Sequence, residues 1–307
     1  MKFRLLLAGT FALATTISQT AYALSCGDTI MSDTTMTSDL GPCPAGGLII
    51  NWATVTLDLA GHKILGTGTG DGVVVHRGGA AIIKGPGMIS NFGVGILVSE
   101  SGGGVATIHD LVLFQNSTGI TFDTSEVQIF DSFILGGTRG VDGIWAGDAV
   151  CDCYRNTITG HSHAGASLHR VGGTFDANVI TANNIGIDLP SSTVVPISIQ
   201  GNRILGNRGD GVSAGRGGIT IAQNYITGNG GNGILLNVGG GVTTVKNNQI
   251  TFNRGYGIGL VSGTDTHIEA NRMLGNGLDL YWSGSGMNNC ADHNIFRTVS
   301  PILLPPC

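Results

Sequence analysis

The feature that most constrains this chain is an internal repeat of the motif Asn-x-Ile. Successive copies are separated by 22, 24, 22, 24 and 23 residues and begin at Asn156, Asn178, Asn202, Asn224, Asn248 and Asn271, the last with methionine in place of isoleucine. The apolar position of the motif continues at Ile64, Ile89, Leu113 and Ile134 before this run and at Phe296 after it. A period of roughly 20 to 50 residues over most of a chain is typical of a solenoid, in which copies of one small unit stack on each other.

Each copy contains three short segments in which apolar residues alternate with other residues. Gly143-Ile-Trp-Ala exemplifies one segment, Val127-x-Ile129 a second, and Asn-x-Ile is the third. A period of two between Gly and Asn turns indicates β-strands, and no stretch has a helical period. A three-stranded unit cannot bury its apolar residues alone. The sequence therefore predicts an all-β solenoid, a single-stranded parallel β-helix of about ten coils of roughly 21 to 25 residues.

The repeat also predicts two ladders of asparagine side chains at the turns. Stacked amides can hydrogen-bond along the rod, and Asn tolerates the left-handed backbone of a sharp corner. The first ladder lies two residues before the apolar position and the second lies three residues after it. Their members are Asn156, Asn178, Asn202, Asn224, Asn248, Asn271 and Asn294 in the first ladder, and Asn116, Asn183, Asn207, Asn229, Asn253 and Asn276 in the second.

The repeat, together with Cys26-Gly-Asp-Thr-Ile30, Cys43-Pro44 and Val55-Thr-Leu-Asp-Leu-Ala-Gly-His-Lys-Ile64, resembles the right-handed parallel β-helix repeat family. That family includes pectate lyases, polygalacturonases, alginate lyases and epimerases, and periplasmic NosD-like proteins. The resemblance covers nearly all of the chain after the first residues. It implies a right-handed β-helix that acts on a polysaccharide, but it does not name the reaction, because function lies in sites carried by a fold.

The catalytic signatures of the family's enzymes are missing from this chain. Gly140-Val-Asp-Gly143 is only faintly similar to the Asn-Thr-Asp-Gly of polygalacturonases, whose Asp-Asp and Arg-Ile-Lys motifs are absent. The Asp-Pro-His of alginate epimerases and the dense carboxylate cluster of pectate lyases are absent too. The Asp-Gly pairs, Asp142-Gly143 among them, are assigned to turns.

Residues 1–23 have the pattern of a secretory signal peptide. Lys2 and Arg4 precede an apolar run that ends in Ala21-Tyr22-Ala23. We expect a secreted or periplasmic protein with an N-terminal cap over residues 24–54, a β-helix over 55–286 and a C-terminal cap over 287–307. No later apolar run is long enough to span a membrane.

The charge of the chain bears on its partners. Without Lys2 and Arg4, 13 basic residues face 20 acidic ones, a balance of −7 that argues against a nucleic-acid partner. An acidic glycan would therefore need a local basic patch or a bridging cation. We expect a monomer that binds a polysaccharide.

The six cysteines are divided between the two ends and the middle of the chain. The simplest pairing joins Cys26 to Cys43 and Cys290 to Cys307, which closes a flap over each open end of the solenoid. Cys151 and Cys153 take inward positions on one strand. Alternate residues of a flat strand are usually too far apart for a disulfide, so we interpret them as buried small hydrophobic residues rather than as a disulfide or metal pair.

Outward positions form rows that run from coil to coil. The residue after Gly-apolar gives the row Leu97, Thr121, Trp145, Ser167, Asp188, Ser213, Leu235, Gly259 and Asp279. The position two residues later gives the row Ser99, Asp123, Gly147, His169, Pro190, Gly215, Asn237, Val261 and Tyr281. The middle coils thus place Trp145, Ser167, His169 and Asp188 on one face, with Asp123 at its edge.

This face is the candidate site for a carbohydrate. Trp145 offers an apolar ring surface to a sugar, and Ser167 and Asp123 offer hydrogen bonds. In β-elimination at a uronate, His169 is the candidate base at C5 and Arg170 the candidate cation that stabilises the developing charge, provided that the strand ends at His169. Asp188 is a candidate to orient the histidine or to bind Ca²⁺. The alternative is a solvated face that carries a single tryptophan.

Two further groups stand out. Phe130 and Tyr154 lie on adjacent coils of another strand, and we expect them to form an aromatic platform for substrate. His161 and His163 accompany His169 in the segment 155–170, but His161 takes an Asn-ladder position and His163 a turn, so three histidines are not expected to share one metal.

The sequence favours an exported β-helix that interacts with a polysaccharide, with a lyase or C5-epimerase as its enzymatic version. The alternative is a non-catalytic glycan-binding or envelope β-helix, or a NosD-like periplasmic accessory protein. The missing catalytic signatures support that alternative.

Overall fold

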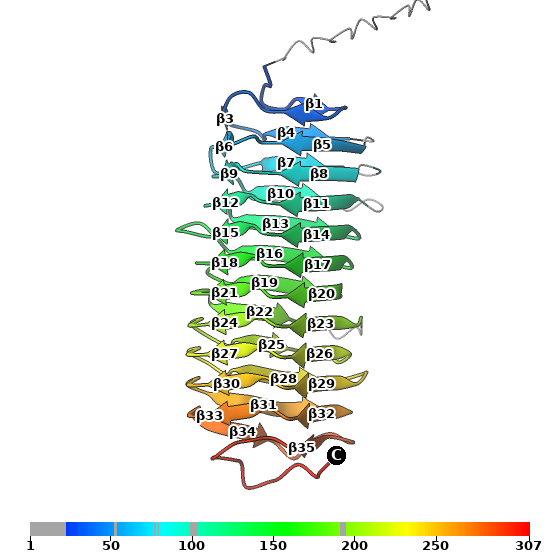
Figure 1. The fold of residues 1–307 in the computed structure, drawn as a ribbon, viewed down its shortest axis with the longest axis vertical. Helices are drawn as coiled ribbons and strands as arrows, with labels where there is room; N and C mark the ends of the chain where they lie inside the picture. The colour runs from blue at the N-terminus through cyan, green and yellow to red at the C-terminus, as the bar shows by residue number, and fades with distance from the viewer. Residues whose placement is uncertain (1–22, 52–53, 77, 79, 99–103, 191–194) are drawn as a thin grey trace, which may run out of the picture.

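The computed structural model describes residues 23–51, 54–76, 78, 80–98, 104–190 and 195–307. The predicted signal peptide therefore lies outside the described residues, apart from its last residue. The described chain is an all-β rod of three parallel sheets, with its two ends at opposite ends of the rod (Figure 1). None of its described elements is a helix long and apolar enough to cross a membrane.

Each coil gives one strand to each sheet. Sheet A has 12 strands in the order β1 (Thr29–Ile30), β4 (Leu48–Ile50), β7 (Asp71–Val75), β10 (Val94–Val98), β13 (Thr118–Asp123), β16 (Asp142–Gly147), β19 (Ala164–His169), β22 (Ile185–Leu189), β25 (Val212–Ala214), β28 (Ile234–Val238), β31 (Tyr256–Gly263) and β34 (Leu278–Trp282).

Sheet B has 12 strands in the order β2 (Thr34–Thr35), β5 (Thr54–Asp58), β8 (Ala80–Lys84), β11 (Val105–His109), β14 (Glu126–Phe130), β17 (Val150–Tyr154), β20 (Gly172–Asp176), β23 (Ile197–Gln200), β26 (Ile219–Ala222), β29 (Thr243–Lys246), β32 (Thr266–Glu269) and β35 (Cys290–Asp292).

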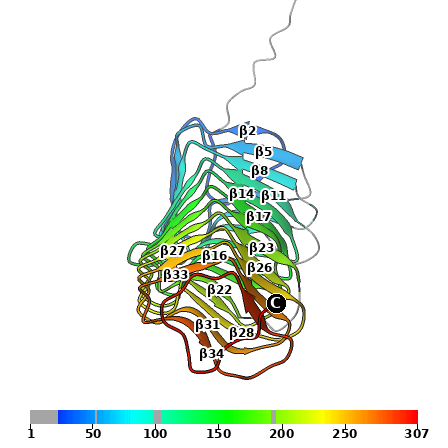
Figure 2. The ribbon, with the colours of Figure 1, turned by 60° about the horizontal axis from the view of Figure 1, so that its bottom comes forward.

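Sheet C has 11 strands in the order β3 (Leu40–Cys43), β6 (Lys63–Gly66), β9 (Met88–Ser90), β12 (Val112–Phe114), β15 (Phe133–Leu135), β18 (Thr157–Thr159), β21 (Val179–Thr181), β24 (Arg203–Leu205), β27 (Tyr225–Thr227), β30 (Gln249–Thr251) and β33 (Arg272–Leu274). The predicted β-helix with three strands per coil is confirmed, and Figure 2 shows the sheets winding around one interior.

The apolar position of the repeat fills this interior. Its residues lie in sheet C, pair with each other from coil to coil, and are almost completely buried from Ile64 to Met273. The last copy is different, because Phe296 lies outside the strands and is 36% exposed. The regular core therefore ends one coil before the repeat does.

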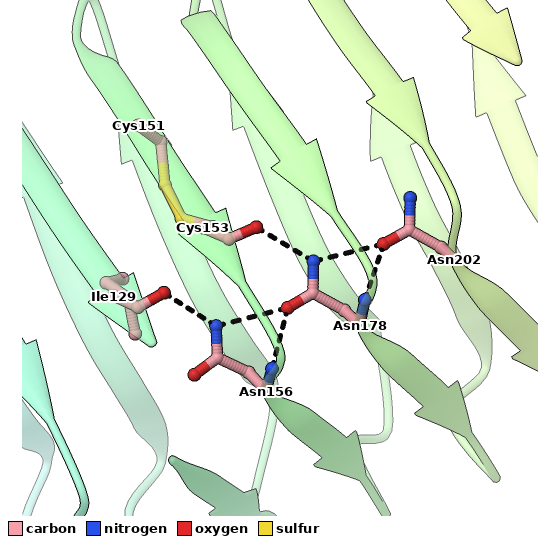
Figure 3. The surroundings of a disulfide bond; sticks show 6 residues. All are labelled: Ile129, Cys151, Cys153, Asn156, Asn178 and Asn202. Atoms are coloured by element: carbon pink, nitrogen blue, oxygen red, sulfur yellow. Dashed lines mark hydrogen bonds between the residues drawn. A yellow bond between two sulfur atoms is a disulfide. The ribbon is translucent and has the colours of Figure 1, made fainter. Parts of the chain in front are cut away.

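The first asparagine ladder forms as predicted (Figure 3). The backbone N–H and Nδ2 of Asn178 donate to Oδ1 of Asn202 at 2.9 and 3.0 Å, and Nδ2 also donates to the carbonyl oxygen of Cys153 at 2.9 Å. The same bonds recur along the rod as far as Asn294. Each buried asparagine amide thus forms hydrogen bonds with the coil before it and with the coil after it, so that its donor and acceptor groups have partners.

The second ladder also forms, and it differs from the prediction only at its C-terminal end. His161 stands in the ladder as predicted, and its backbone N–H donates to Oδ1 of Asn183 at 3.0 Å. At the other end, Oδ1 of Asp279 accepts bonds from the backbone N–H and Nδ2 of Asn276 at 3.2 and 2.9 Å. Asp279 is therefore buried and closes the ladder, so its predicted place on the outward row is wrong.

The disulfides at the two ends form as predicted, between Cys26 and Cys43 and between Cys290 and Cys307. The interpretation of Cys151 and Cys153 as free thiols is wrong, because the structure joins them in a disulfide inside the rod (Figure 3). Their Cα atoms are 5.6 Å apart, within the range that a disulfide spans and closer than on a flat strand. Their inward, fully buried positions are as predicted.

Candidate functional site

The candidate site lies on the outer face of sheet A. In-register pairing of β13, β16, β19, β22 and β25 sets Thr121, Trp145, Ser167, Asp188 and Ser213 in one row. The residues on either side of each row member, such as Ile144 and Ala146, point into the core. This central part of the row is as predicted, because parallel strands that pair without slipping convert sequence spacing directly into position.

Ser167 and His169 form a hydrogen-bonded pair beside Trp145. Ser167 Oγ lies 3.1 Å from His169 Nε2, and the rings of Trp145 and His169 are tilted by 37° with centroids 5.5 Å apart. Ser167 is completely buried although it lies on the outer face of the sheet, while both rings are half-buried. The hydrogen bond with the serine hydroxyl therefore fixes the orientation of the His169 ring beside the ring of Trp145.

Asp188 is the buried carboxyl group of the site. Its side chain lies next to Ser167 and Ser213 in the row, and the residue is only 8% exposed. Burial raises the pKa of this carboxyl group, while a hydrogen bond from Ser213 and the charges of His163 and His169 oppose that rise only in part. Asp188 consequently keeps its proton to a higher pH than a surface aspartate does.

Asp142 and His163 form a second carboxylate–histidine pair, which the sequence reasoning missed. Asp142 Oδ1 lies 2.8 Å from His163 Nδ1 and accepts the backbone N–H of Ala164 at 3.1 Å. The Asp142 side chain is 10% exposed and that of His163 is 47% exposed. The carboxylate therefore orients the imidazole with its other nitrogen toward solvent, and both groups act electrostatically on Asp188.

Gly147 explains why Trp145 and Asp123 converge. Asp123, Gly147 and His169 follow each other in register, as predicted. A Cβ atom at Gly147 would lie 2.8 Å from Asp123 Oδ1 and 3.1 Å from Cη2 of Trp145. The missing side chain thus leaves the space that the edge of the indole ring and the half-buried carboxylate of Asp123 use.

Arg170 lies just outside this group. Strand β19 ends at His169, which was the condition for Arg170 to face outward, and Arg170 has a left-handed φ of 54°. Its Nε and Nη2 both donate to the carboxylate of Asp148 on the preceding coil. The guanidinium group therefore lies at the corner between sheets A and B, paired with an exposed aspartate.

Phe130 and Tyr154 are not brought to this site, because they lie on sheet B. Their rings are stacked with centroids 4.9 Å apart, and His109 extends the stack at 4.8 Å. The guanidinium carbon of Arg155 lies 4.7 Å from the centroid of the Tyr154 ring. Since the ring faces cover each other, the stack presents mainly ring edges to solvent.

The three histidines of the segment 155–170 are separated as expected. His161 is buried, neither of its ring nitrogens has a hydrogen-bond partner among the described residues, and burial lowers its pKa to about 4. His163 pairs with Asp142 and His169 with Ser167. No three metal-binding side chains come together within the part of the chain that the structure describes.

Comparison with known structures places this fold among proteins with related rods. The periplasmic alginate epimerase AlgG is similar at a TM-score of 0.60 and 12% identity, over 87% of this chain and 77% of AlgG. The Dettilon tailspike protein is similar at 0.50 and 16%, over 88% of this chain and 60% of the tailspike. The A-module of the Azotobacter vinelandii mannuronan C-5 epimerase AlgE4 gives 0.49 and 16%, over 86% and 91%.

A search of curated proteins gives no match. The family model described as a right handed beta helix region matches residues 94–273 and 186–300, more than half of the chain. Together with three parallel sheets that run the length of the rod, this match establishes that the chain belongs to the right-handed β-helix family.

Proposed function

We propose that this protein is exported and binds an acidic polysaccharide along sheet A, where His169 removes a proton from a uronate in a lyase or C5-epimerase reaction. The observation that carries the proposal is the position of Asp188. A buried carboxyl group with a raised pKa lies in one row with Trp145 and Ser167 and within the electrostatic reach of two histidines. Perturbed titratable groups of this kind gather at functional sites.

Binding would use the indole and the polar groups around it. The half-buried ring of Trp145 offers an apolar surface to one face of a sugar, and Asp123 and Ser213 offer hydrogen bonds at either side. The similarity in fold to a periplasmic alginate epimerase supports an acidic polymer as the ligand.

The proton removal that we propose follows from the hydrogen bond between His169 and Ser167. If its Nε2–H donates to Ser167 Oγ, Nδ1 is the unprotonated nitrogen that accepts the C5 proton. The electron pair left behind moves toward the uronate carboxylate, which Asp188 stabilises by donating a hydrogen bond when it carries its proton. In this proposal Asp188 takes the charge-stabilising role first considered for Arg170, because Arg170 is paired with Asp148.

Two outcomes are open to the intermediate. In a lyase, the C4–O bond breaks with its electrons on the leaving oxygen, and a C4=C5 double bond forms. In an epimerase, C5 takes a proton on the opposite face. His163, which Asp142 orients, is the candidate donor for that second proton.

The experiment incubates the mature protein with polygalacturonate, alginate, hyaluronan and chondroitin sulfate. Ultraviolet absorbance reports unsaturated lyase products, and incorporation of deuterium from D₂O at C5 reports epimerisation. We expect His169→Ala to lower the rate by about 10² to 10⁴, the usual contribution of a general base, while glycan binding is retained. Trp145→Ala should weaken binding by up to about tenfold.

The matched controls are His293→Ala and Tyr225→Ala, which remove an exposed histidine outside sheet A and an exposed tyrosine of sheet C. Both should behave like the wild type. Binding that depends on Trp145 without turnover of any polymer would instead favour the non-catalytic glycan-binding protein. Equal binding by the wild type and Trp145→Ala would remove sheet A as the site.

A further inference from the structure

A pair of stacked tyrosines lies on the same face of the rod, toward its C-terminal end. Tyr281 pairs with Gly259, so it continues the row of Trp145, Ser167 and Asp188 in the place that the sequence assigned to Asp279. The rings of Tyr256 and Tyr281 are parallel within 6°, with centroids 4.4 Å apart. Both residues are half-buried, and neither hydroxyl group makes a hydrogen bond within the described chain.

The tyrosine pair owes its position to a glycine. Tyr256 pairs with Leu278, three residues away from the pairing of Gly259 with Tyr281. A Cβ atom at Gly259 would lie 2.5 Å from Cδ2 of Tyr256, so the Tyr256 ring extends along the strand and covers Gly259. Glycine at this position is what allows two rings from different strand positions to meet in the row.

Two arginines lie at corners where the chain enters sheet A. Arg208 and Arg254 each follow a member of the second asparagine ladder, and their backbone N–H groups donate to Asn183 and Asn229 at equivalent corners leading into sheet A. Both are exposed, and the ion pairs of the described residues include neither of them. In a chain with an acidic balance, exposed cations at the corners before β25 and β31 are complementary to an acidic polymer.

The spacing along the row is set by the coils. From Asp188 the row passes through Ser213, Leu235 and Gly259 to Tyr281, which is four strand spacings or about 19 Å. From Trp145 to Tyr281 the distance is six spacings, about 29 Å. An extended oligosaccharide of several sugars can cover this distance, whereas a disaccharide cannot.

We infer that Tyr256, Tyr281 and Arg254 form a distal subsite for the same acidic polysaccharide, separated from the Asp188 site by about four strand spacings. This inference rests on the proposed function. The polymer lies along sheet A, with one sugar at Trp145 and Asp188 and a later sugar against the exposed edges and hydroxyl groups of the tyrosines, while Arg254 pairs with a uronate carboxylate. The protein consequently selects long chains over short ones, because a second contact on the same chain forms at high effective concentration.

The test measures affinity for polygalacturonate and alginate oligosaccharides of increasing length by isothermal titration calorimetry, with the mature chain. We expect the wild type to bind chains that span the row at least about tenfold more tightly than short ones. The Tyr256→Ala/Tyr281→Ala variant should lose this gain and bind short chains as the wild type does. Arg254→Ala, which alters only an exposed side chain, should lose part of the gain.

The control is Tyr225→Ala on sheet C, which should keep the full dependence on length. Circular dichroism and thermal unfolding check the fold of the double variant, and Arg254→Ala tests the inference independently of it. Wild-type binding that does not depend on length, or a gain that survives both the Tyr and the Arg254 variants, would overturn the distal subsite and leave the proposed function standing. Failure of the wild type to bind any oligosaccharide would overturn both.

Discussion

Replacing His161 by asparagine tests how strongly the interior of the rod excludes a charge. His161 is 1% exposed, and neither ring nitrogen has a hydrogen-bond partner in the part of the chain that the structure describes. Its ring lies against two glycines. A Cβ atom at Gly136 would lie 2.9 Å from Nδ1, and one at Gly143 would lie 3.2 Å from Nε2. An imidazolium ion formed here would have neither a counter-charge nor room to turn toward solvent, which is why the pKa of His161 falls to about 4.

The magnitude follows from the difference between the folded and unfolded pKa values. In the unfolded chain the histidine binds its proton near pH 6.5, whereas in the folded chain it does so only near pH 4. Between these values the unfolded state binds more protons, so the free energy of unfolding decreases as the pH falls. A gap of about 2.5 units corresponds to about 3 kcal/mol, all of it present above pH ~6.5 and lost by pH ~4.

The assay is urea unfolding, followed by circular dichroism, of the wild type and His161→Asn at pH values from 8 to 4. Asparagine is the residue that the ladder carries at neighbouring coils, so the variant is expected to fold. The difference between their unfolding free energies should shift by about 3 kcal/mol in favour of the variant as the pH falls. His293→Asn is the matched control at an exposed position. Parallel stability curves for the wild type and His161→Asn would refute the reasoning.

Two further substitutions test the site and the ladder. Asp188→Asn should raise the melting temperature at pH 7.5, because burial raises the pKa of Asp188 and the ionised form costs stability in the native state. The gain should vanish below pH ~4, where the carboxyl group is protonated in both the folded and the unfolded chain. A wild type that is more stable than the variant at pH 7.5 would contradict this prediction. Asn202→Ala should lower the free energy of unfolding by about 3 kcal/mol in a urea titration, because the backbone N–H and Nδ2 of Asn178 both lose their acceptor. The control Gln249→Ala, at an exposed position of β30, should cost well under about 1 kcal/mol.

The repeat predicted most of the fold because in-register pairing leaves little freedom. Once Asn156, Asn178 and Asn202 are known to be equivalent, the relative positions of Trp145, Ser167 and Asp188 follow, and the structure places them accordingly. Nothing comparable specifies what happens at the end of the rod. There Asp279 is buried and accepts the hydrogen bonds that a ladder asparagine would accept, so Tyr281 takes its place in the outward row.

The period of the repeat does not predict contacts that depend on a corner or on the local shape of one strand. The Asp142–His163 pair joins the start of a strand to a turn, and the period does not fix the direction of a turn side chain. An aspartate one coil before a histidine is the signal that could have revealed it. The Cys151–Cys153 disulfide depends on a local shortening of the strand, which spacing alone does not show.

The asparagine ladder makes the coil an interchangeable unit. Every rung offers the same acceptor to the coil before it and the same donors to the coil after it, so a coil removed between equivalent asparagines, such as residues 225–248, leaves two rungs that still fit together. Distances between sites along sheet A can therefore change only in steps of one strand spacing. Deletion of that coil would bring Tyr281 nearer to Asp188 by one strand spacing, about 4.8 Å, and the shortest chain that reaches both would shorten with it. By gaining or losing whole coils, a protein of this architecture can change the length of polymer that it measures without altering any side chain that touches it.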